Sequence, residues 1–498
     1  MEVDAVATPP HDVEADVVAF AVPDPTELSS EVRELDRRLN GRLAHLVDDG
    51  ELTGTPGTLT LVHAVDELPA PRIAAVGVGG REGIDADALR TAAAAVAART
   101  GSIGGRTVAW VLDRDDALPA VEQARAVVEG LVLGRYDAGR WKTNGAAPAP
   151  MERIVLCGNG AEGVAGEARR AAVVAAWANE CRDLVNAPGN ELTPEHLADF
   201  ARGLAGRFAT VTCEVLGPEE IDAAGMGAFA AVAEGSHYPP RLVVCRYEPG
   251  SPARADLLLG LVGKAITFDA GGLSLKPADG MEDMKSDMGG GAAVLAALGA
   301  IAELGVPVRI LAVVPACENM PSGHAYRPGD VICAANGKTI EVTNTDAEGR
   351  LILADALWYA REEGATHLLD LATLTGTMQV AMGDFYAGLF GTDDAWVEEI
   401  RRAAETSGDH AWPFPLHRAY ERFLESPYAD LRNAPDKKRG SSIIAALFLR
   451  EFAGAGPWAH LDIAGTAFLD RPRDYYQRVG ATGYGVRLIE ELARGMSP

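Results

Sequence analysis

The sequence predicts two α/β domains, a smaller one at the N-terminus and a larger one after it. The chain has 498 residues, which is more than a single domain usually holds. Apolar, strand-like runs alternate with amphipathic or alanine-rich segments, a pattern typical of a largely parallel sheet flanked by helices. In the second half, polar residues gather where apolar runs end, the edge at which open α/β sheets bind ligands. We therefore expect the larger domain to carry the functional site on a mixed, mostly parallel sheet.

The first domain is expected to span residues 1–165. Residues 1–14 are polar and contain proline, which indicates a loose tail. Leucines 35, 39, 43 and 46 fall on one stripe and predict a single helix over residues 27–47. We find no candidate nucleophile or metal-binding cluster in this part of the sequence. The glycines at 77–80 lack the full nucleotide-binding fingerprint, so we predict no phosphate loop either. The remaining expected elements are strands at 16–22, 58–62, 73–77, 107–112 and 153–157, and helices at 86–99 and 120–133.

A stretch rich in proline, alanine and glycine at 141–150 is expected to be exposed. A helix at 166–186 should connect the two domains, and the second domain should span 187–498. Thr193 followed by Pro194 is typical of a helix N-cap with proline at the first helical position. Asn336-Gly337 predicts a hairpin turn within 331–342. The other expected elements are strands at 210–215, 241–247, 256–262, 308–314 and 367–371, and helices at 288–304, 351–362 and 441–452.

Composition narrows the class of protein. The hydrophobic content of 48% supports large cores and excludes general disorder. The 45 basic and 71 acidic side chains give a net charge of −26, which disfavours nucleic acid or an anionic membrane as the main partner. The six cysteines are scattered, which favours buried thiols in a reducing compartment. We expect no signal peptide and no run of the about 18 apolar residues that span a membrane, hence a cytoplasmic protein.

The run Asn344-Thr345-Asp346-Ala347-Glu348-Gly349-Arg350 concentrates two acids and a cation. If this backbone is extended, side chains two apart point the same way, so Asp346, Glu348 and Arg350 share one face. Two such carboxylates can hold hard or borderline cations through oxygen, and the guanidinium can clamp an anion. Taken alone, such a run is much more typical of a solvated turn with salt bridges than of a metal site.

A second stretch follows the apolar run 257–262, which is expected to be a buried strand. It reads Gly263-Lys264-Ala265-Ile266-Thr267-Phe268-Asp269-Ala270-Gly271-Gly272-Leu273-Ser274-Leu275-Lys276 and continues to Asp287-Met288-Gly289-Gly290. Its polar residues lie among glycines, which permit close approach of the backbone. Ionisable side chains are thus expected at the edge of the sheet where ligands bind.

Together the two stretches resemble the leucyl aminopeptidase family, the dinuclear-metal cytosol aminopeptidases. The N-T-D-A-E-G-R run is the signature of that family without a change, and G-K-x-x-x-x-D-x-G-G-x-x-x-K and D-M-G-G match equally well. The similarity extends from about Asn186 to about Gly465, essentially the C-terminal two-thirds. The resemblance implies a metal-dependent exopeptidase with two divalent ions per subunit.

The resemblance also assigns metal ligands. Asp269 and Glu348 match the two bridging carboxylates, and Asp346 matches a ligand of one ion through its side chain and main-chain carbonyl. Lys264 and Asp287 match ligands of the other ion. A lysine ligand must bind as the neutral amine, so its pKa must be lowered strongly by the nearby dications.

The resemblance names two catalytic residues. Lys276 matches a lysine that stays charged and donates to the carbonyl oxygen as negative charge develops there. Arg350 matches an arginine that holds a bicarbonate ion as general base. Lys285 is close in sequence but matches no catalytic position, so we expect it at the surface or the rim of the site.

For the substrate, the resemblance implies peptides with a free N-terminus. Asn344, Thr373, Leu374 and Gly376 match substrate contacts, while Met284 and the region of Ala464 match the side-chain pocket. An apolar, methionine-containing pocket favours Leu-like or Met-like residues, although Met284 is as readily an ordinary packing residue. The family further implies a homohexamer, with an N-terminal domain linked to assembly more than to chemistry.

Several alternatives remain open. The donor set permits Mn²⁺, Zn²⁺, Mg²⁺ or Co²⁺. The histidines lack HExxH spacing and the serines lack a G-x-S-x-G elbow, which makes other hydrolytic mechanisms improbable. A DNA-binding or regulatory role, which some relatives have, is disfavoured by the acidic N-terminus. A silent scaffold is disfavoured by the presence of Lys276 and Arg350, and a dipeptidase acting on Cys-Gly is the nearer alternative.

Overall fold

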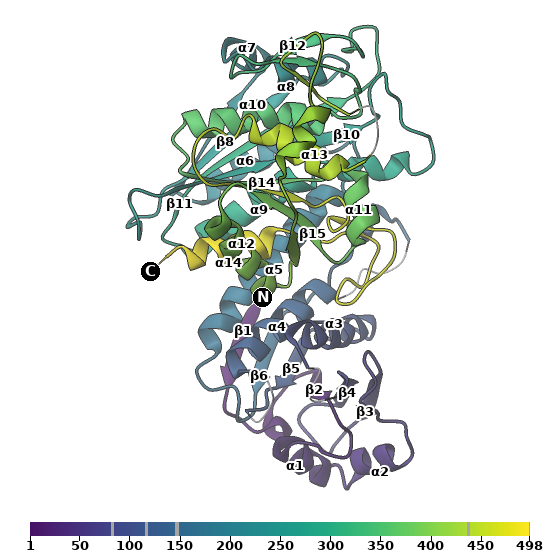
Figure 1. The fold of residues 1–498 in the computed structure, drawn as a ribbon. Helices are drawn as coiled ribbons and strands as arrows, with labels where there is room; N and C mark the ends of the chain where they lie inside the picture. The colour runs from purple at the N-terminus through teal and green to yellow at the C-terminus, as the bar shows by residue number, and fades with distance from the viewer. Residues whose placement is uncertain (81–83, 115–117, 145–148, 436–438, 498) are drawn as a thin grey trace. The chain divides into compact units, whose positions relative to one another are not determined.

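The computed structural model describes residues 1–80, 84–114, 118–144, 149–435 and 439–497 (Figure 1). It contains two compact units. One comprises Met1–Asn179 and Asp470–Val479, and the other comprises Glu180–Leu469 and Gly480–Pro498. Both units are layered α/β structures, as the alternation of strands and helices predicts.

The first unit is built on a six-stranded sheet with the order β1-β6-β5-β2-β4-β3. All neighbours in it run parallel except the β3–β4 pair. Apolar side chains of the sheet and of the first helix form the core of this unit. The strands are β1 (Glu2–Val6), β2 (Val17–Val22), β3 (Leu59–His63), β4 (Arg72–Gly77), β5 (Thr107–Val111) and β6 (Arg153–Cys157), and the helices are η1 (Pro10–Asp12), α1 (Ser30–Arg38), α2 (Arg42–Asp48), α3 (Ala86–Ser102), α4 (Ala120–Gly134), η3 (Gly139–Trp141) and the start of α5 (Ala165–Asn186).

Two expectations for this unit are wrong. Residues 1–14 are not a loose tail, because β1 pairs in parallel with β6 and Asp4 binds the guanidinium of Arg153. The helix expected over 27–47 is two helices, since Asn40 and Gly41 adopt φ angles of 56° and 77° and end the first one. The leucine stripe survives this break, so periodicity alone did not reveal it. The expected exposed stretch at 141–150 lies partly outside the described residues.

The second unit is built on a nine-stranded mixed sheet with the path β16-β15-β18-β14-β9-β11-β8-β7 and with β10 paired to β11. Its central strands β18, β14, β9 and β11 run parallel, whereas β15, β8 and β7 are joined through antiparallel pairs. The strands are β7 (Val211–Leu216), β8 (Arg241–Tyr247), β9 (Leu258–Gly263), β10 (Ala265–Asp269), β11 (Arg309–Asn319), β14 (His367–Ala372), β15 (Ala387–Gly391), β16 (Ala411–Pro413) and β18 (Trp458–Asp462).

Helices cover this sheet, and α9 and α10 lie against its central strands. A smaller sheet, β12-β13-β17, contains the predicted hairpin, and β19 pairs with β20. Thr193 accepts from the amide of His196, as an N-cap should. The remaining elements are α6 (Pro194–Arg207), α7 (Pro218–Ala223), α8 (Gly227–Ala233), η4 (Met281–Ser286), α9 (Gly289–Leu304), β12 (Val331–Cys333), β13 (Thr339–Glu341), α10 (Gly349–Glu362), α11 (Gly376–Met382), α12 (Asp394–Ser407), η5 (Arg418–Phe423), β17 (Leu431–Arg432), α13 (Ser441–Arg450), β19 (Phe468–Leu469), β20 (Gly480–Ala481) and α14 (Val486–Gly495).

Two expectations from composition need correction. Among the described residues, the helical stretch Met281–Leu304 is long and apolar enough to cross a membrane, contrary to the expectation that no such run exists. Of its most apolar window, 83% is buried inside the fold, as in the core helix of a globular protein. The six cysteines are free thiols, but Cys333 is exposed and Cys213 partly exposed, so not all of them are buried.

The parallel strands bring their carboxyl ends to one edge of the second sheet. Gly263 at the end of β9 is in register with Leu371 near the end of β14, and Ala372 is in register with Asp462 at the end of β18. A Cβ atom on Gly263 would lie 2.6 Å from the carbonyl oxygen of Gly290, so glycine is needed for the close approach of β9 and α9. The loops that leave these strands therefore converge on one place.

Candidate metal centre

The predicted ligands come from five points that converge at this edge. Lys264 lies between β9 and β10, and Asp269 is the last residue of β10. Asp287 directly follows η4, and Glu348 is the N-cap residue of α10. Asp346 lies in the turn before it. All five belong to the second unit.

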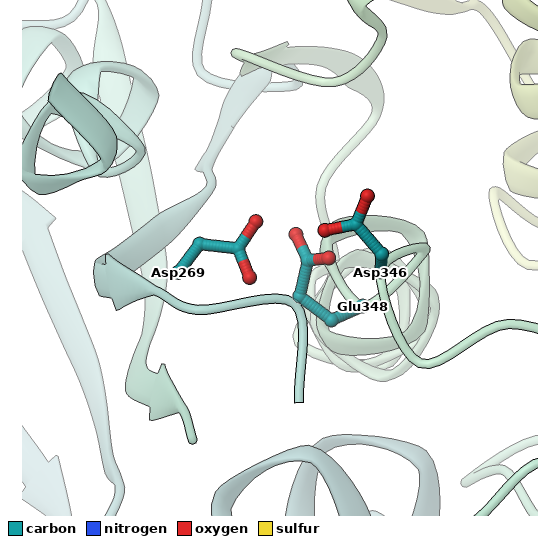
Figure 2. Close-up of side chains that lie close together, drawn as sticks. All are labelled: Asp269, Asp346 and Glu348. Atoms are coloured by element: carbon teal, nitrogen blue, oxygen red, sulfur yellow. The ribbon is translucent and has the colours of Figure 1, made fainter. Parts of the chain in front are cut away.

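Three carboxylates form the centre of the cluster. Asp269, Asp346 and Glu348 each offer an oxygen, and these oxygens all lie within 4.8 Å of one another (Figure 2). Asp269 is held in place because its Oδ1 accepts from the amide of Gly271 at 2.9 Å and from Asn319 Nδ2 at 2.8 Å. Oxygen atoms so placed are a donor set for hard or borderline divalent cations.

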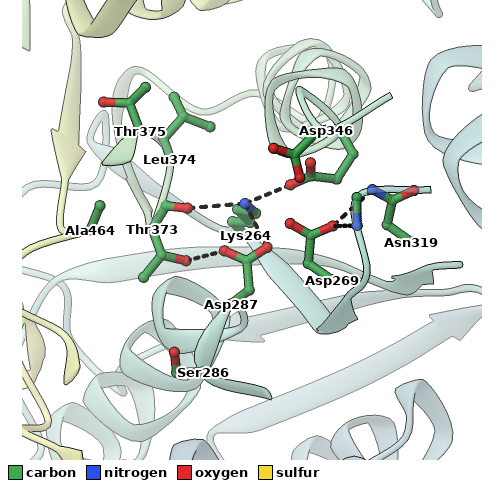
Figure 3. Close-up of polar contacts among 12 residues, drawn as sticks. Lys264, Asp269, Ser286, Asp287, Asn319, Asp346, Thr373, Leu374, Thr375 and Ala464 are labelled. Carbon is green, nitrogen blue, oxygen red and sulfur yellow. Dashed lines mark hydrogen bonds and ion pairs between the residues drawn. The ribbon is translucent and has the colours of Figure 1, made fainter. Parts of the chain in front are cut away.

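Lys264 lies on the other side of Glu348. Its Nζ is 2.8 Å from Glu348 Oε1, 2.8 Å from Asp287 Oδ2 and 3.0 Å from the carbonyl oxygen of Thr373 (Figure 3). Only 2% of the residue is exposed. Burial lowers the pKa of Lys264, but the carboxylates of Asp287, Glu348 and Asp269 raise it by a larger amount. The net shift of this pKa is therefore upward. In the absence of metal, this amine is therefore a cation that neutralises the acids around it.

Lys276 pairs with the outer acids. Its Nζ is 2.7 Å from Asp269 Oδ2 and also hydrogen-bonds to Asp346. Burial lowers its pKa, and the carboxylates of Asp269, Glu348 and Asp346 more than reverse that effect. The side chain is 20% exposed, more than that of Lys264. Lys276 is thus a charged donor at the open side of the cluster.

The acids themselves are crowded. Burial and the neighbouring Glu348 carboxylate raise the pKa of Asp269 to about 6. Burial likewise raises the pKa of Asp287 and of Asp346, whereas for Glu348 the two lysine ammonium groups outweigh burial and lower its pKa. Four carboxylates face only two ammonium groups here. This excess of negative charge in a buried place fits the binding of additional cations.

Arg350 lies in the first turn of α10 and is 6% exposed. Its Nη1 donates to the carbonyl oxygen of Asn433 at 2.9 Å, while its buried Nε has no hydrogen-bond partner among the described residues. Burial lowers the pKa of Arg350 to about 10. A guanidinium N–H without a partner among the described residues can donate to a small anion.

The backbone of the 344–350 run differs from the expected extended strand. Residues 345 and 346 form a turn, Glu348 already has helical angles, and α10 begins at Gly349. The acids meet because the turn folds them together and not because they alternate along a strand. A Cβ atom on Gly349 would lie 2.6 Å from Lys264 Nζ, which explains the glycine after the acids.

Of the predicted substrate contacts, Thr373 touches Lys264 directly. Thr373 accepts from Lys264 through its carbonyl oxygen and donates its hydroxyl to Asp287 Oδ1 at 2.7 Å (Figure 3). Leu374 follows Thr373, and Gly376 begins α11. Asn344 accepts from the amide of Asp346 and precedes the acid turn. Met284 lies in η4, three residues before Asp287, and is partly buried.

Some residues of the site were not predicted. Asn319 ends the long strand β11 and orients both Asp269 and the carbonyl of Thr345. Asn433 binds the backbone of Thr343, Asn344 and Ala347. Asp462, at the end of β18, accepts from the amides of Leu374, Thr375 and Ala464. A polar residue at the end of an apolar run was the available signal for Asn319 and Asp462, whereas Asn433 lies in an irregular segment with no such signal.

The chain is similar to known proteins of one family. The model of the cytosol aminopeptidase family, catalytic domain, matches residues 179–490, and that of its N-terminal domain matches residues 17–145. A probable cytosol aminopeptidase of Solibacter usitatus (strain Ellin6076) is 45% identical over 448 residues, covering 90% of this chain and 92% of the relative. Another, from Thermosynechococcus vestitus (strain NIES-2133 / IAM M-273 / BP-1), is 40% identical over the full length of both chains.

Solved structures agree as well. A mutant of tomato leucine aminopeptidase matches with a TM-score of 0.89 and 34% identity, over 99% of this chain and 96% of that one. The bottromycin maturation enzyme BotP in complex with Mn matches with a TM-score of 0.85 and 36% identity, over 97% of this chain and all of that one. The chain therefore belongs to the cytosol aminopeptidase family and is a hydrolase of the metallo-aminopeptidase class.

Proposed function

We propose that this chain releases N-terminal amino acids from peptides by means of two divalent metal ions bound at the cluster. The observation that carries the proposal is the convergence of four carboxylates and two lysines at one buried edge of the sheet. Neither a serine elbow nor a histidine zinc motif is present in the sequence to support another route.

The proposed ligands divide between the two ions. Asp269 and Glu348 would bridge them, since both lie in the middle of the cluster. Asp346 would complete one site, and Lys264 with Asp287 the other. When bound, the two ions would polarise the scissile carbonyl and ionise a water molecule for attack. The supporting feature is that each of these side chains already points into the same space (Figures 2 and 3).

Lys276 is the proposed electrophile. It is held as a charged ammonium by Asp269 and Asp346 on the more open side of the cluster. A charged donor there would stabilise negative charge that develops on the carbonyl oxygen of the substrate. Both contacts are with proposed ligands, so Lys276 is freed to donate elsewhere when those carboxylates bind metal instead.

Arg350 is the proposed holder of a bicarbonate ion that acts as general base. Its unused buried Nε supports an anion at this place, and its other contact, to Asn433, fixes the guanidinium. An anion so held can carry a proton from the attacking water to the leaving amine. A bound bicarbonate would explain why the cluster itself offers no free histidine or glutamate as the general base.

The proposed substrate is a peptide with a free N-terminus. The neutral α-amine would bind beside Asp287, while Asn344, Thr373, Leu374 and Gly376 contact the main chain. Met284 and the Ala464 region would contact the first side chain, which favours Leu-like and Met-like residues. Coordination of the amine would make the enzyme an exopeptidase, because a blocked terminus cannot bind in this way.

The ions are proposed to be Mn²⁺ or Zn²⁺, with Mg²⁺ and Co²⁺ also compatible. Carboxylate oxygens with a single amine do not choose among these metals by affinity alone. The matched BotP structure is a complex with Mn, which supports Mn²⁺ as the first ion to try.

Hydrolysis of Leu-p-nitroanilide tests the proposal. Protein treated with a chelator should be inactive and should recover on addition of Mn²⁺ or Zn²⁺, whereas a Glu348→Gln variant should stay inactive under the same conditions. N-acetyl-Leu-p-nitroanilide should not be cleaved, because its amine is blocked. A folded protein that cleaves neither substrate with any of the four metals would contradict the proposal, and equal cleavage of both substrates would contradict the exopeptidase assignment.

Membership of the same family also supports a proposal for the roles of the three segments of the chain and for its oligomeric state. Residues 1–165 would serve assembly or regulation, 166–186 would connect, and 187–498 would carry out catalysis. We propose a homohexamer in the cytoplasm, with a mass six times the 52.3 kDa of the chain. Light scattering coupled to gel filtration measures the mass of the assembly in solution directly. A mass equal to that of one chain would contradict the proposed hexamer.

A further inference from the structure

Two cysteines far from the metal centre lie directly opposite each other on neighbouring strands. Cys213 on β7 and Cys245 on β8 are partners in the antiparallel register of these strands. β7 is the edge strand of the sheet. Each thiol shifts the pKa of the other, as expected of neighbouring side chains on one face of the sheet. Neither residue has a role in the proposed peptidase chemistry, so a function of this pair does not depend on that chemistry.

The hydrogen-bond pattern shows which kind of antiparallel pair they form. The amide of Glu248 donates to the carbonyl oxygen of Thr210 at 2.9 Å, next to the register pair Val211–Tyr247. Hydrogen-bonded and non-hydrogen-bonded pairs alternate along an antiparallel ladder. Counting from Thr210 and Glu248, the pair Cys213–Cys245 is non-hydrogen-bonded, and in such pairs the Cα atoms are about 4.5 Å apart. That separation lies within the range of about 4.4–6.8 Å that a disulfide spans.

The two thiols differ in solvent exposure and in the direction in which their surroundings shift the pKa. Cys213 is partly exposed, whereas Cys245 is fully buried. The neighbouring Cys245 thiol and the Arg202 guanidinium on α6 lower the pKa of Cys213, although burial and the Glu214 carboxylate oppose them. The neighbouring Cys213 thiol and burial raise the pKa of Cys245. The accessible thiol is thus the better nucleophile, and the buried thiol is held beside it.

We propose that Cys213 and Cys245 are a reversible thiol–disulfide pair that is oxidised by peroxides. The Cys213 thiolate attacks one oxygen of hydrogen peroxide, the O–O bond breaks, and Cys213 sulfenic acid and hydroxide form. Cys245 then loses its proton and attacks the Cys213 sulfur, which forms the S–S bond and releases the sulfenic oxygen as water. The two sulfurs together lose two electrons, and the peroxide is reduced to two molecules of water. The disulfide links the edge strand covalently to the sheet.

Peptide mapping of the full-length protein tests the pair. The protein is treated with hydrogen peroxide, alkylated and digested with trypsin, which cuts after Arg207, Arg241 and Arg246. Cys213 and Cys245 then fall in separate peptides, 208–241 and 242–246. We expect these peptides to become linked, with a combined mass two hydrogen atoms below their sum, and to separate again after dithiothreitol.

Matched variants separate this outcome from general oxidation. Cys213→Ser should abolish the linked peptide and leave Cys245 available for alkylation after unfolding. Cys333→Ser removes the exposed thiol and should leave the linkage unchanged. Oxidation of Cys213 to sulfinic or sulfonic acid without linkage, or linkage of Cys213 to a different cysteine, would overturn the proposal. Resistance of both thiols to peroxide while Cys333 reacts would overturn it too.

Discussion

At the scale of single residues, the site depends on two lysines placed among the same acids. Lys264 is buried against Asp287 and Glu348, and Lys276 reaches Asp269 and Asp346 from the more open side. Both have raised pKa values in the metal-free protein because the carboxylates outweigh burial. Their proposed roles nevertheless differ, since one must lose its proton to bind metal and the other must keep it.

Replacement of Lys276 should affect turnover more than binding. We expect Lys276→Met to lower kcat for Leu-p-nitroanilide by about 10²–10³-fold with little change in KM, because a donor aimed at developing charge acts mainly in the transition state. Steady-state kinetics with saturating Mn²⁺ measure both constants. Lys285→Met is the matched control, since the Lys285 ammonium binds the carbonyl oxygen of Asn186 and not an acid of the cluster. An equal loss in both variants would show that the effect is one of net charge.

Lys264 makes metal binding depend on pH. The carboxylates hold this amine protonated, so an ion that uses it as a ligand must displace a proton. Affinity for Mn²⁺ should therefore rise between pH 6 and pH 8, by up to roughly tenfold per pH unit for each proton released. Isothermal titration calorimetry of the metal-stripped protein, in buffers of different ionisation enthalpy, gives the number of protons released when Mn²⁺ binds. An affinity that does not change with pH, with no proton released, would rule out Lys264 as a ligand.

At the scale of elements, the proposed ligands lie where strands and helices begin or end, and the loops around them are fixed by buried polar groups. Asp462 at the end of β18 is fully buried. Its Oδ1 accepts from the amides of Leu374, Thr375 and Ala464, and its Oδ2 accepts from the Thr375 hydroxyl at 2.5 Å. One carboxylate thus fixes the loop after β14, which carries the proposed substrate contacts, to the loop after β18.

Asp462→Asn should loosen the substrate loop without removing a metal ligand. An amide keeps the shape but replaces one acceptor oxygen with a donor that faces other donors. We expect kcat/KM to fall by about 10–100-fold, mainly through KM, while bound Mn²⁺ stays as in the wild type. Asp256→Asn, an exposed change before β9 at the opposite end of the sheet, should change neither quantity. Loss of metal together with activity would mean that Asp462 supports the ligands instead.

A second buried acid, Asp355 on α10, binds the first turn of α8. It accepts from the amides of Phe229 and Ala335 and is 1% exposed. Burial raises its pKa to about 7, although these amides oppose the shift. The unfolded chain ionises this group at a lower pH, so the folded state holds the extra proton between about pH 4 and pH 7.

The stability of the protein should accordingly fall as pH rises through that window. The loss from this group is up to ~4 kcal/mol and is complete above about pH 7. Asp355→Asn removes the titration, so its Tm relative to wild type should increase from pH 5 to pH 8, even if the variant is less stable throughout. Differential scanning fluorimetry at several pH values measures the difference. A Tm difference that is constant with pH would mean that the Asp355 pKa is unshifted.

Much of the element structure could be predicted from the sequence, because apolar runs and capping residues are local signals. The failures depended on properties that these signals do not carry. β1 needs a partner about 150 residues away, and the break at Asn40-Gly41 depends on backbone angles that do not disturb the leucine stripe. In the site, the motif residues could be predicted as ligands, but Asn433 could not, because its amide hydrogen-bonds to a turn about 90 residues earlier in the chain.

At the scale of the whole molecule, an acidic chain of two α/β units has its candidate metal cluster in the second unit, judged from the residues that the structure describes. The proposed ligands lie between residues 264 and 348, but the side chains that hold the ligand turn and the substrate loop extend to Asn433 and Asp462. This spread explains why short motifs were enough to propose the chemistry, whereas the supporting contacts became visible only in the folded chain. The central claim is that this cluster binds two ions together.

Counting bound metal tests that claim most directly. Protein that has been stripped of metal with a chelator is dialysed against Mn²⁺. The metal content per chain is then measured for the wild type and for Glu348→Gln at the same pH. Because Glu348 is the proposed bridge, we predict two ions per wild-type chain and at most one in the variant, with circular dichroism confirming that both are folded. Two ions in both proteins, or none in a wild type that still hydrolyses Leu-p-nitroanilide, would contradict the dinuclear account.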